Sequence, residues 1–239
     1  MPQFVITSSS IKDGLVAVEG KDFKHVKSLR ISLNDEVVLL DEKAYQYIAR
    51  LEKITKQKAI FRILNQFSSS HEPSGIILAQ AIIKPHRMQL AIQKATELGV
   101  DEIIPFISQY TVVKINQEHF MDRYKKIIKE AVNQSMRAYI PKLHSPITFD
   151  KLITTIPESK KILFHYDPSA KPIQEFTETL KDNTPVTLII GPEGGFSSEE
   201  IKYATQYNAV VASLGLNILR SETAAISAIS ITSFIRGLK

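Results

Sequence analysis

Short apolar segments separated by polar or turn residues fill the first seventy residues of the chain. Five of them are rich in Val, Ile, Tyr and Phe and predict β-strands: residues 3–6, 15–20, 36–42, 45–54 and 58–64. A predicted helix at residues 21–30 interrupts them. Several short strands at close spacing are typical of a small β-barrel. The stretch 68–75 is rich in Ser, Pro and Gly, contains no apolar residue and predicts a linker.

After the linker, predicted strands alternate with predicted helices. Residues 76–83 form a continuous apolar run, as expected of a strand that is buried on both faces. Residues 85–99 predict a helix, because Pro85 suits its first turn and Gly99 is placed to end it. The remaining predicted elements are a strand at 102–106, a helix at 119–137, strands at 161–166, 186–190 and 209–215, and a helix at 223–235. This alternation predicts an α/β domain with a largely parallel sheet.

The composition supports a folded protein and excludes several classes of site. The 239 residues are 44% hydrophobic and 23% charged, which is enough to bury a substantial core. The absence of cysteine excludes disulfide scaffolds and cysteine-based zinc or thiol chemistry, and the six histidines show no metal-ligand spacing. With no signal-like N-terminus and no apolar run of membrane-spanning length, we expect a soluble, cytoplasmic protein.

The charge distribution weakly favours a polyanionic partner. The net charge is +5, and residues 1–70, with 11 Lys and Arg against 8 Asp and Glu, are the more basic part per residue. Within the predicted helix at 21–30, Lys24, Lys27 and Arg30 are spaced by three and are expected to share a face. Such a face would contact RNA phosphates, and a solvated basic surface is the alternative.

A glycine turn separates a predicted strand from a predicted helix in LIIGPEGGFSSEE, residues 188–200. Ser197 and Glu200 have the spacing of a capping box at the start of that helix. Turns in this position commonly bind ligands in α/β sheets. The spacing does not fit nucleotide-binding motifs, no lysine follows the glycines, and Glu193 would repel a phosphate. The turn therefore predicts a ligand without phosphate, for which a positive charge would suit Glu193; a purely structural tight turn is the alternative.

A second passage from strand through loop to helix follows in SLGLNILRSETAAISA, residues 213–228. Loops at the carboxyl ends of successive parallel strands lie side by side, so we expect the two loops to form one site. The helix at 223–235 is rich in Ala and Ser, which lets another backbone approach closely. It is either a well-packed helix of the core or an intersubunit contact.

These two motifs together resemble those of the RsmE family, the bacterial 16S rRNA (uracil-N3)-methyltransferases of the SPOUT superfamily. DFKHVKSLRISLNDEVVLLD resembles the family's N-terminal PUA-like signature, and QKATELGVDEIIPFIS and KEAVNQSMRAYIPKL resemble its central motifs, in the family's order. The resemblance spans the whole chain. It implies a PUA-like, RNA-binding β-barrel at residues 1–70 and an α/β methyltransferase domain of the SPOUT type, with a C-terminal trefoil knot, at residues 75–239.

The resemblance also implies the cofactor, the partners and the site residues. The cofactor would be S-adenosylmethionine, and the substrate N3 of a uridine in the decoding region of 16S rRNA within the assembled 30S subunit. The enzyme would be a homodimer with its active site at the interface, with no metal and no membrane. Gln134 and Arg137, predicted to share a helical face, would contact the substrate from the partner subunit; an exposed, ion-pairing arginine is the alternative. The cofactor would be bound by Gly191, Glu193, Gly194, Leu214, Gly215, Leu219, Arg220 and Thr223.

Arg220 is the candidate catalytic residue, because a guanidinium would stabilise the negative charge that develops on the uracil carbonyls as N3 attacks the methyl group. The alternative is that Arg220 holds its loop through backbone carbonyls. Glu222 is either a base or a buried partner of Arg220, and the general base and the role of Glu193 are left unassigned. The chain departs from the family pattern at Gln3, His86, Gln89 and Tyr110, which bears on RNA contacts and leaves both cofactor loops intact.

Two other functions remain open at this stage. The first is a SPOUT ribose 2′-O-methyltransferase, against which the ELGV and NQSMR motifs favour the uracil enzyme. The second is a non-catalytic RNA-binding factor in ribosome assembly. The intact GPEGG and LRSETA loops argue against it, because a protein without the activity would be free to lose them.

Overall fold

The computed structural model describes residues 1–68, 72–156, 159–167, 170–182 and 184–238. The chain forms two compact units, Met1–Glu72 with Lys129–Ile140, and Pro73–Ile128 with Pro141–Lys239. Of the predicted linker at 68–75, residues 69–71 lie outside the described residues. The predicted domain ranges, 1–70 and 75–239, remain predictions.

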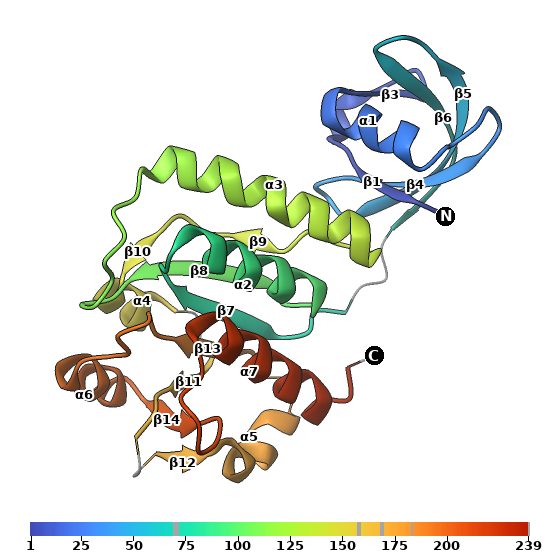
Figure 1. The fold of residues 1–239 in the computed structure, drawn as a ribbon. Coiled ribbons are helices and arrows are strands. Elements are labelled where there is room, and N and C mark those ends of the chain that lie inside the picture. Colours follow the sequence, from blue (N-terminus) through green and yellow to red (C-terminus); the bar gives the residue numbers. More distant parts are fainter. Residues whose placement is uncertain (69–71, 157–158, 168–169, 183, 239) are drawn as a thin grey trace. The chain divides into compact units, whose positions relative to one another are not determined.

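A six-stranded sheet forms most of the first unit (Figure 1). Its strands are, in spatial order, β1 (Gln3–Val5), β4 (Glu36–Leu40), β5 (Tyr45–Ile54), β6 (Lys58–Ser68), β3 (Leu15–Glu19) and β2 (Ile11–Lys12). Neighbouring strands are antiparallel, except that β1 and β4 are parallel. Buried and exposed residues alternate along β3 and along the first part of β5, which turns one face toward an apolar core. A 3₁₀ turn, η1 (Ser8–Ser10), precedes β2.

Residues 129–140 complete this first unit through hydrogen bonds to strand β1. The Gln3 side-chain amide donates to the carbonyl oxygens of Val132, at 3.3 Å, and Arg137, at 2.8 Å. The backbone N–H of Val5 donates to Asn133 Oδ1 at 2.8 Å. Gln3 is one of the departures from the family pattern, and its side chain links strand β1 to residues 132–137 within this unit.

The helix of the first unit, α1 (Gly20–Ser28), is shorter than predicted and packs Phe23 and Val26 into the core. It ends in a Schellman motif, because Ile31 N–H donates to Val26 O and Arg30 has a left-handed φ of 54°. The turn carries Ile31 into the core. The expectation of one shared helical face is therefore wrong for Arg30, which lies beyond the helix.

The second unit is built on an eight-stranded parallel sheet. The spatial order is β10 (Ile147–Thr148), β8 (Glu102–Ile107), β7 (Ile76–Ala81), β13 (Val186–Ile190), β11 (Lys160–Phe164), β14 (Ala209–Ser213) and β12 (Lys171–Pro172), and β9 (Lys142–Leu143) also pairs with β8. The central strands β7 and β13 are buried along their whole length, which explains their continuous apolar sequences. The short strands β9, β10 and β12 carry too few residues for a periodic pattern and were not predicted.

Helices cover this sheet (Figure 1). They are α2 (Pro85–Glu97), α3 (Gln117–Ser135), α4 (Phe149–Thr155), α5 (Thr177–Lys181), α6 (Ser198–Gln206) and α7 (Ser221–Ile235), with a 3₁₀ turn, η2 (Ile173–Phe176), before α5. In the sheet, β11 separates β14 from β13, yet α7, the helix that follows β14, packs against α2, β7 and β13. The chain therefore crosses back past β11 between β14 and α7. Among the described residues, every helix is too short or too polar to cross a lipid bilayer.

The end of α3 corrects a further prediction. The helix was expected to continue to Arg137, but it stops at Ser135. Met136 takes a left-handed φ of 57°, and Arg137 N–H donates to the carbonyl oxygen of Val132, five residues earlier. The hydrogen bond from Ile31 to Val26 at the end of α1 has the same spacing. Gln134 and Arg137 therefore do not share a helical face.

Candidate functional site

A cavity of about 490 Å³ opens at the carboxyl edge of the parallel sheet, entirely within the second unit. The loops that follow β11, β13 and β14 line it, together with the start of α7 and with Arg87 of α2. All three strands are parallel, so their carboxyl ends meet at one edge of the sheet. The volume lies within the range of about 300–1,000 Å³ that is usual for small-molecule sites.

The structure brings together most of the residues that the two loop motifs singled out. Seven of the predicted cofactor residues line the cavity: Gly191, Glu193, Gly194, Leu214, Gly215, Leu219 and Arg220. Thr223 does not belong to the lining and is exposed in the first turn of α7. The expectation that the two loops lie side by side is confirmed by this cavity, and their role as a binding site stays a prediction.

Close packing explains two glycines of the first loop. A Cβ atom on Gly191 would lie 2.9 Å from Cε2 of Phe196, and one on Gly194 would lie 3.0 Å from Cβ of Tyr110. Both distances are shorter than ordinary van der Waals contacts, so a side chain at either position would displace an aromatic neighbour or the loop. Tyr110, another departure from the family pattern, thus packs against the loop that lines the cavity.

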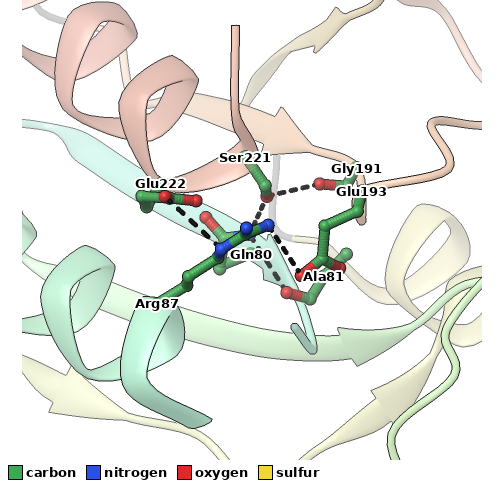
Figure 2. A network of polar contacts seen from close by, with 7 residues as sticks. All are labelled: Gln80, Ala81, Arg87, Gly191, Glu193, Ser221 and Glu222. Carbon is green, nitrogen blue, oxygen red and sulfur yellow. Dashed lines mark hydrogen bonds and ion pairs between the residues drawn. The ribbon is translucent and has the colours of Figure 1, made fainter. Parts of the chain in front are cut away.

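A buried glutamine joins the two loops (Figure 2). Gln80, near the end of β7, is 0% exposed, and its Nε2 donates to Ser221 Oγ at 2.8 Å and to Ala81 O at 3.0 Å. Ser221 Oγ in turn donates to the carbonyl oxygen of Gly191 at 2.6 Å. The first residue of α7 is therefore hydrogen-bonded both to the central strand and to the glycine loop.

Arg87 lies between two carboxylates, one from the loop after β13 and one from the first turn of α7 (Figure 2). Its Nη1 donates to Glu193 Oε1 at 3.3 Å, and its Nε lies 3.7 Å from Glu222 Oε1. Glu222 is 6% exposed, whereas Glu193 and Arg87 are partly exposed. Of the two interpretations of Glu222, a base or a buried partner of Arg220, the second is right about burial, but the partner is Arg87 and not Arg220.

Three polar atoms of this network have no hydrogen-bond partner within the described part of the chain: Gln80 Oε1, Arg87 Nε and Glu222 Oε2. A buried polar group without a partner costs about 1–3 kcal/mol. Two of the three are acceptors, so the network is chemically suited to a ligand or a water that supplies donors.

The first helical turn after the glycine loop is fixed by a second buried carboxylate. Ser197 Oγ accepts from Glu200 N–H at 3.2 Å, and Glu200 Oε2 accepts from Ser197 N–H at 3.0 Å, which confirms the predicted capping box. Glu200 also accepts from the Ser108 hydroxyl, at 3.2 Å, and from the Gln109 N–H, at 2.9 Å. The loop after β8 is thereby fastened to the start of α6.

Arg220 occupies the position just before α7 and lines the cavity with its side chain exposed. Its guanidinium has no hydrogen-bond or ion-pair partner in the described ranges, so it does not hold the loop through backbone carbonyls. This leaves the group open to a ligand or substrate.

The predicted RNA-contacting residues lie in the first unit and differ in exposure. Lys24 and Lys27 are exposed on α1, with Lys27 Nζ 4.5 Å from the Phe23 ring centroid, and Arg30 is exposed just beyond the helix. Gln134 is exposed at the end of α3. Arg137 is 8% exposed, and its guanidinium lies 3.9 Å from the Tyr139 ring centroid. Arg137 is thus buried and stacked on an aromatic ring rather than exposed.

Sequence reasoning missed the residues that join the loops, namely Gln80, Arg87 and Ser221. Gln80 carries a usable signal, because it is the one polar residue in the apolar run at 76–83. Arg87 and Ser221 carry none, since their partners are distant in sequence. Of the other departures from the family pattern, Gln89 accepts from Arg123 at 3.3 Å and His86 is exposed. No cluster of three or more His, Cys, Asp and Glu side chains in the described ranges could hold a metal ion.

Comparison with known proteins gives matches along both units. The model of an RNA methyltransferase domain matches residues 70–233, and that of an RNA methyltransferase PUA domain matches residues 18–64. The ribosomal RNA small subunit methyltransferase E of Rickettsia conorii is 33% identical over 204 residues, 84% of this chain and 82% of that protein. The protein of the same name from Bacillus subtilis is 27% identical over 228 residues, 91% of this chain and 89% of that protein.

Two solved structures share the fold along nearly the whole chain. A methyltransferase from Legionella pneumophila, in complex with the bound cofactor SAM, matches with a TM-score of 0.87 and 32% identity, covering 97% of this chain and 96% of that one. A ribosomal RNA small subunit methyltransferase E from Neisseria gonorrhoeae, bound to S-adenosyl methionine, matches with a TM-score of 0.86 and 28% identity, covering 98% of each chain.

Proposed function

This chain belongs to the RNA methyltransferase family, with the small-subunit methyltransferases E as relatives, and on that premise we propose that it methylates N3 of a uridine in 16S rRNA. S-adenosylmethionine is the methyl donor, and the target uridine lies in the decoding region of the assembled 30S subunit. The observation that carries the proposal is the meeting of the GPEGG and LRSETA loops at one cavity, which is the geometry that a single cofactor requires. The SAM-bound relatives support the same cofactor.

The chemistry of the cavity fits S-adenosylmethionine. Apolar side chains such as Ile190, Leu214 and Leu219 suit the apolar parts of the cofactor, and the glycine loop brings backbone close to it. Two carboxylates face one guanidinium in the network at the cavity, which favours a positively charged ligand over a phosphate. When bound, S-adenosylmethionine supplies an electrophilic methyl group. We propose that the predicted cofactor residues hold it, with Thr223 contributing from the first turn of α7.

We assign the catalytic role to Arg220. As uracil N3 attacks a methyl group, N3 loses its proton and negative charge gathers on the neighbouring carbonyl oxygens. An exposed guanidinium at the edge of the cavity can donate hydrogen bonds to those oxygens. Glu222 is held by Arg87 and is buried, so we assign it to positioning, and the general base stays open.

We further propose the SPOUT-type trefoil knot and a homodimer with the active site at the interface. The knot is supported by the path of the chain, which runs from β14 back across β11 to α7 over the central strands. The dimer is supported by apolar side chains exposed on α7 and its preceding loop, where Phe234 is 85% and Leu216 94% exposed. The partner's residues equivalent to Gln134 and Arg137 would complete the site, with Gln134 as the contact and Arg137 as its buried support.

RNA binding by the first unit completes the proposal. The PUA domain match covers α1, where Lys24 and Lys27 are exposed, and Arg30 follows directly. Such cations bind phosphates and supply affinity without reading sequence.

The proposed function is tested by incubating the protein and labelled S-adenosylmethionine with unmethylated 30S subunits and, separately, with naked 16S rRNA. The RNA is then digested and the labelled nucleoside identified. We expect 3-methyluridine, formed preferentially on the 30S subunit. A labelled 2′-O-methyl nucleoside would overturn the assignment of N3, and binding of the subunit without any label would indicate a non-catalytic RNA-binding factor instead.

A further inference from the structure

A second cavity, of about 190 Å³, is lined by residues to which the function proposed above assigns no role. It lies within the second unit, between the connection from β7 to α2, the segment at residues 113–116 and the first turns of α3. Pro85 lines this cavity, and Arg87, two residues further along α2, lines the cofactor cavity. Strands β7 and β13 are parallel neighbours, so the connection after β7 and the loop after β13, which line the two cavities, leave the sheet at the same edge.

The walls of the second cavity are apolar and aromatic. Ile82, Ile83 and Pro85 form one side. Phe120 and Tyr124 form another, with ring centroids 4.5 Å apart at an interplanar angle of 60°. Both rings are buried, and the Tyr124 hydroxyl donates to the carbonyl oxygen of Pro85 at 3.4 Å. Burial raises the pKa of Tyr124.

The rim of this cavity is basic. Lys114, His119 and Arg123 belong to its lining, which contains no acidic residue. On α3 the spacing of His119 and Arg123 by four residues puts them on one side of the helix, and the neighbouring Glu118 and Asp122 do not belong to the lining. The charge arrangement is therefore complementary to an anion that lies across the mouth of an apolar slot.

We propose that this cavity binds one unpaired nucleotide of the RNA substrate, with the base inserted among the apolar side chains and its phosphates beside Lys114 and Arg123. The inference rests on the proposed function, because it names a second contact of the same substrate. Unpaired bases in RNA are held in this way, by insertion between apolar and aromatic side chains with cations along the backbone. An apolar side chain of a protein would fill the slot equally well but would make no use of the basic rim.

Segments that leave the same edge of the sheet line both cavities, which gives this contact a purpose. A nucleotide held beside Pro85 would belong to the same RNA strand as the uridine whose N3 must reach the cofactor cavity lined by Arg87. Anchoring such a neighbour restricts the motion of the target base before methyl transfer.

Two variants test the proposal against one matched control. Val113→Trp fills the slot, and Lys114→Gln combined with Arg123→Gln removes the rim cations. Lys125→Gln is the control, because Lys125 is exposed on α3 but outside the lining. With naked 16S rRNA we expect Val113→Trp to raise KM roughly 5- to 100-fold, the range found for losing one stacked base. The double variant should reduce the steepness of the plot of log binding constant against log salt concentration by about 1.4. This corresponds to two lost phosphate contacts at about 0.7 each for single-stranded RNA.

The control and the cofactor readout separate this proposal from the proposed function. Lys125→Gln should keep KM within about twofold of the unmodified protein, and S-adenosylmethionine should bind all variants equally. Unchanged KM in both slot variants would overturn the nucleotide site while methylation itself stands. If the unmodified protein yields no labelled nucleoside, the proposed function fails, and the nucleotide site is then decided by binding alone.

The binding measurement uses hexauridylate and a ribose-phosphate hexamer that lacks bases, followed by methyl NMR of isoleucine. We expect hexauridylate, but not the abasic hexamer, to shift the resonances of Ile82, Ile83 and Ile115, and Val113→Trp to abolish those shifts. Equal shifts with both probes would reduce the site to a phosphate contact and overturn base insertion. No shift with either probe, together with a raised KM of Val113→Trp on 30S subunits alone, would identify a ribosomal protein as the occupant.

Discussion

Replacing Ser221 by alanine tests whether the two loops of the cofactor cavity depend on one hydroxyl group. The Ser221 hydroxyl accepts from Gln80 and donates to the carbonyl oxygen of Gly191, at 2.8 and 2.6 Å. Alanine removes both hydrogen bonds without adding bulk. Gln80 keeps its bond to Ala81 O, but the Gly191 carbonyl loses a donor at the exact turn that lines the cavity.

The magnitude follows from the burial of the groups. Ser221 is 5% exposed, so the freed partners gain little from water. Leaving such a group unsatisfied costs about 1–3 kcal/mol. We therefore expect the free energy of unfolding to fall by about 2 kcal/mol, which at a urea m-value of about 2 kcal/mol/M lowers the midpoint by about 1 M. Because the loops are no longer joined, the Kd for S-adenosylmethionine should rise about tenfold, which corresponds to about 1.4 kcal/mol.

The control is Ser233→Ala on the same helix. Ser233 Oγ is buried and has no hydrogen-bond partner among the described residues, so its removal should leave the urea midpoint unchanged or raise it. Urea unfolding followed by circular dichroism gives the stability, and isothermal titration calorimetry gives the affinity. Equal midpoints and equal Kd values for the two variants would refute the reasoning that Ser221 joins the loops.

Four further predictions concern other parts of the molecule. Arg220→Ala should lower kcat by about 100-fold or more while thermal unfolding stays unchanged, because its exposed guanidinium makes no structural contact among the described residues; surviving activity would remove Arg220 from catalysis. Gly194→Ala should weaken binding of S-adenosylmethionine in calorimetry, since its Cβ would meet an aromatic side chain at 3.0 Å; unchanged affinity would show that the loop adapts. Burial, with a neighbouring carboxylate, raises the pKa of Tyr47 to about 12. The free energy of unfolding should therefore be highest below about pH 10 and fall by roughly 2–3 kcal/mol as the pH rises to about 12, because the ionised hydroxyl is disfavoured in the folded protein. Tyr47→Phe should remove this alkaline loss of stability in urea titrations, and a loss that persists in the variant would exclude Tyr47 as the cause. Lys24→Gln with Lys27→Gln should weaken RNA binding and reduce its salt dependence without changing the Kd for S-adenosylmethionine, and an unchanged salt dependence would identify a merely solvated face.

Much of the fold was predictable because its signals are local. The strands β7 and β13 are apolar throughout since they are buried on both faces, and the capping box of Ser197 and Glu200 lies within four consecutive residues. The two loops of the cavity were predictable as neighbours because they follow parallel strands of one sheet.

The parts that sequence reasoning missed depend on contacts between distant residues or on unusual backbone. Gln80 and Ser221 are 141 residues apart, and Arg87 and Glu193 are 106 residues apart, so no local pattern links them. The chain leaves both helices through a left-handed φ at Arg30 and Met136, which are not glycines, and helical spacing alone therefore predicted both helices to end two residues too late. In each case the tertiary structure decided what the local sequence left open.

The first unit is built from two segments that are far apart in the sequence, and this affects the order in which it can fold during protein synthesis. Residues 1–72 leave the ribosome well before residues 129–140, at about 5–20 residues per second, so β1 waits for several seconds for Val132, Asn133 and Arg137. Until then the Gln3 amide and the Val5 N–H have water in place of their final partners. The N-terminal segment is thus not a portable module, and transplanting it into another protein requires the end of α3 to travel with it.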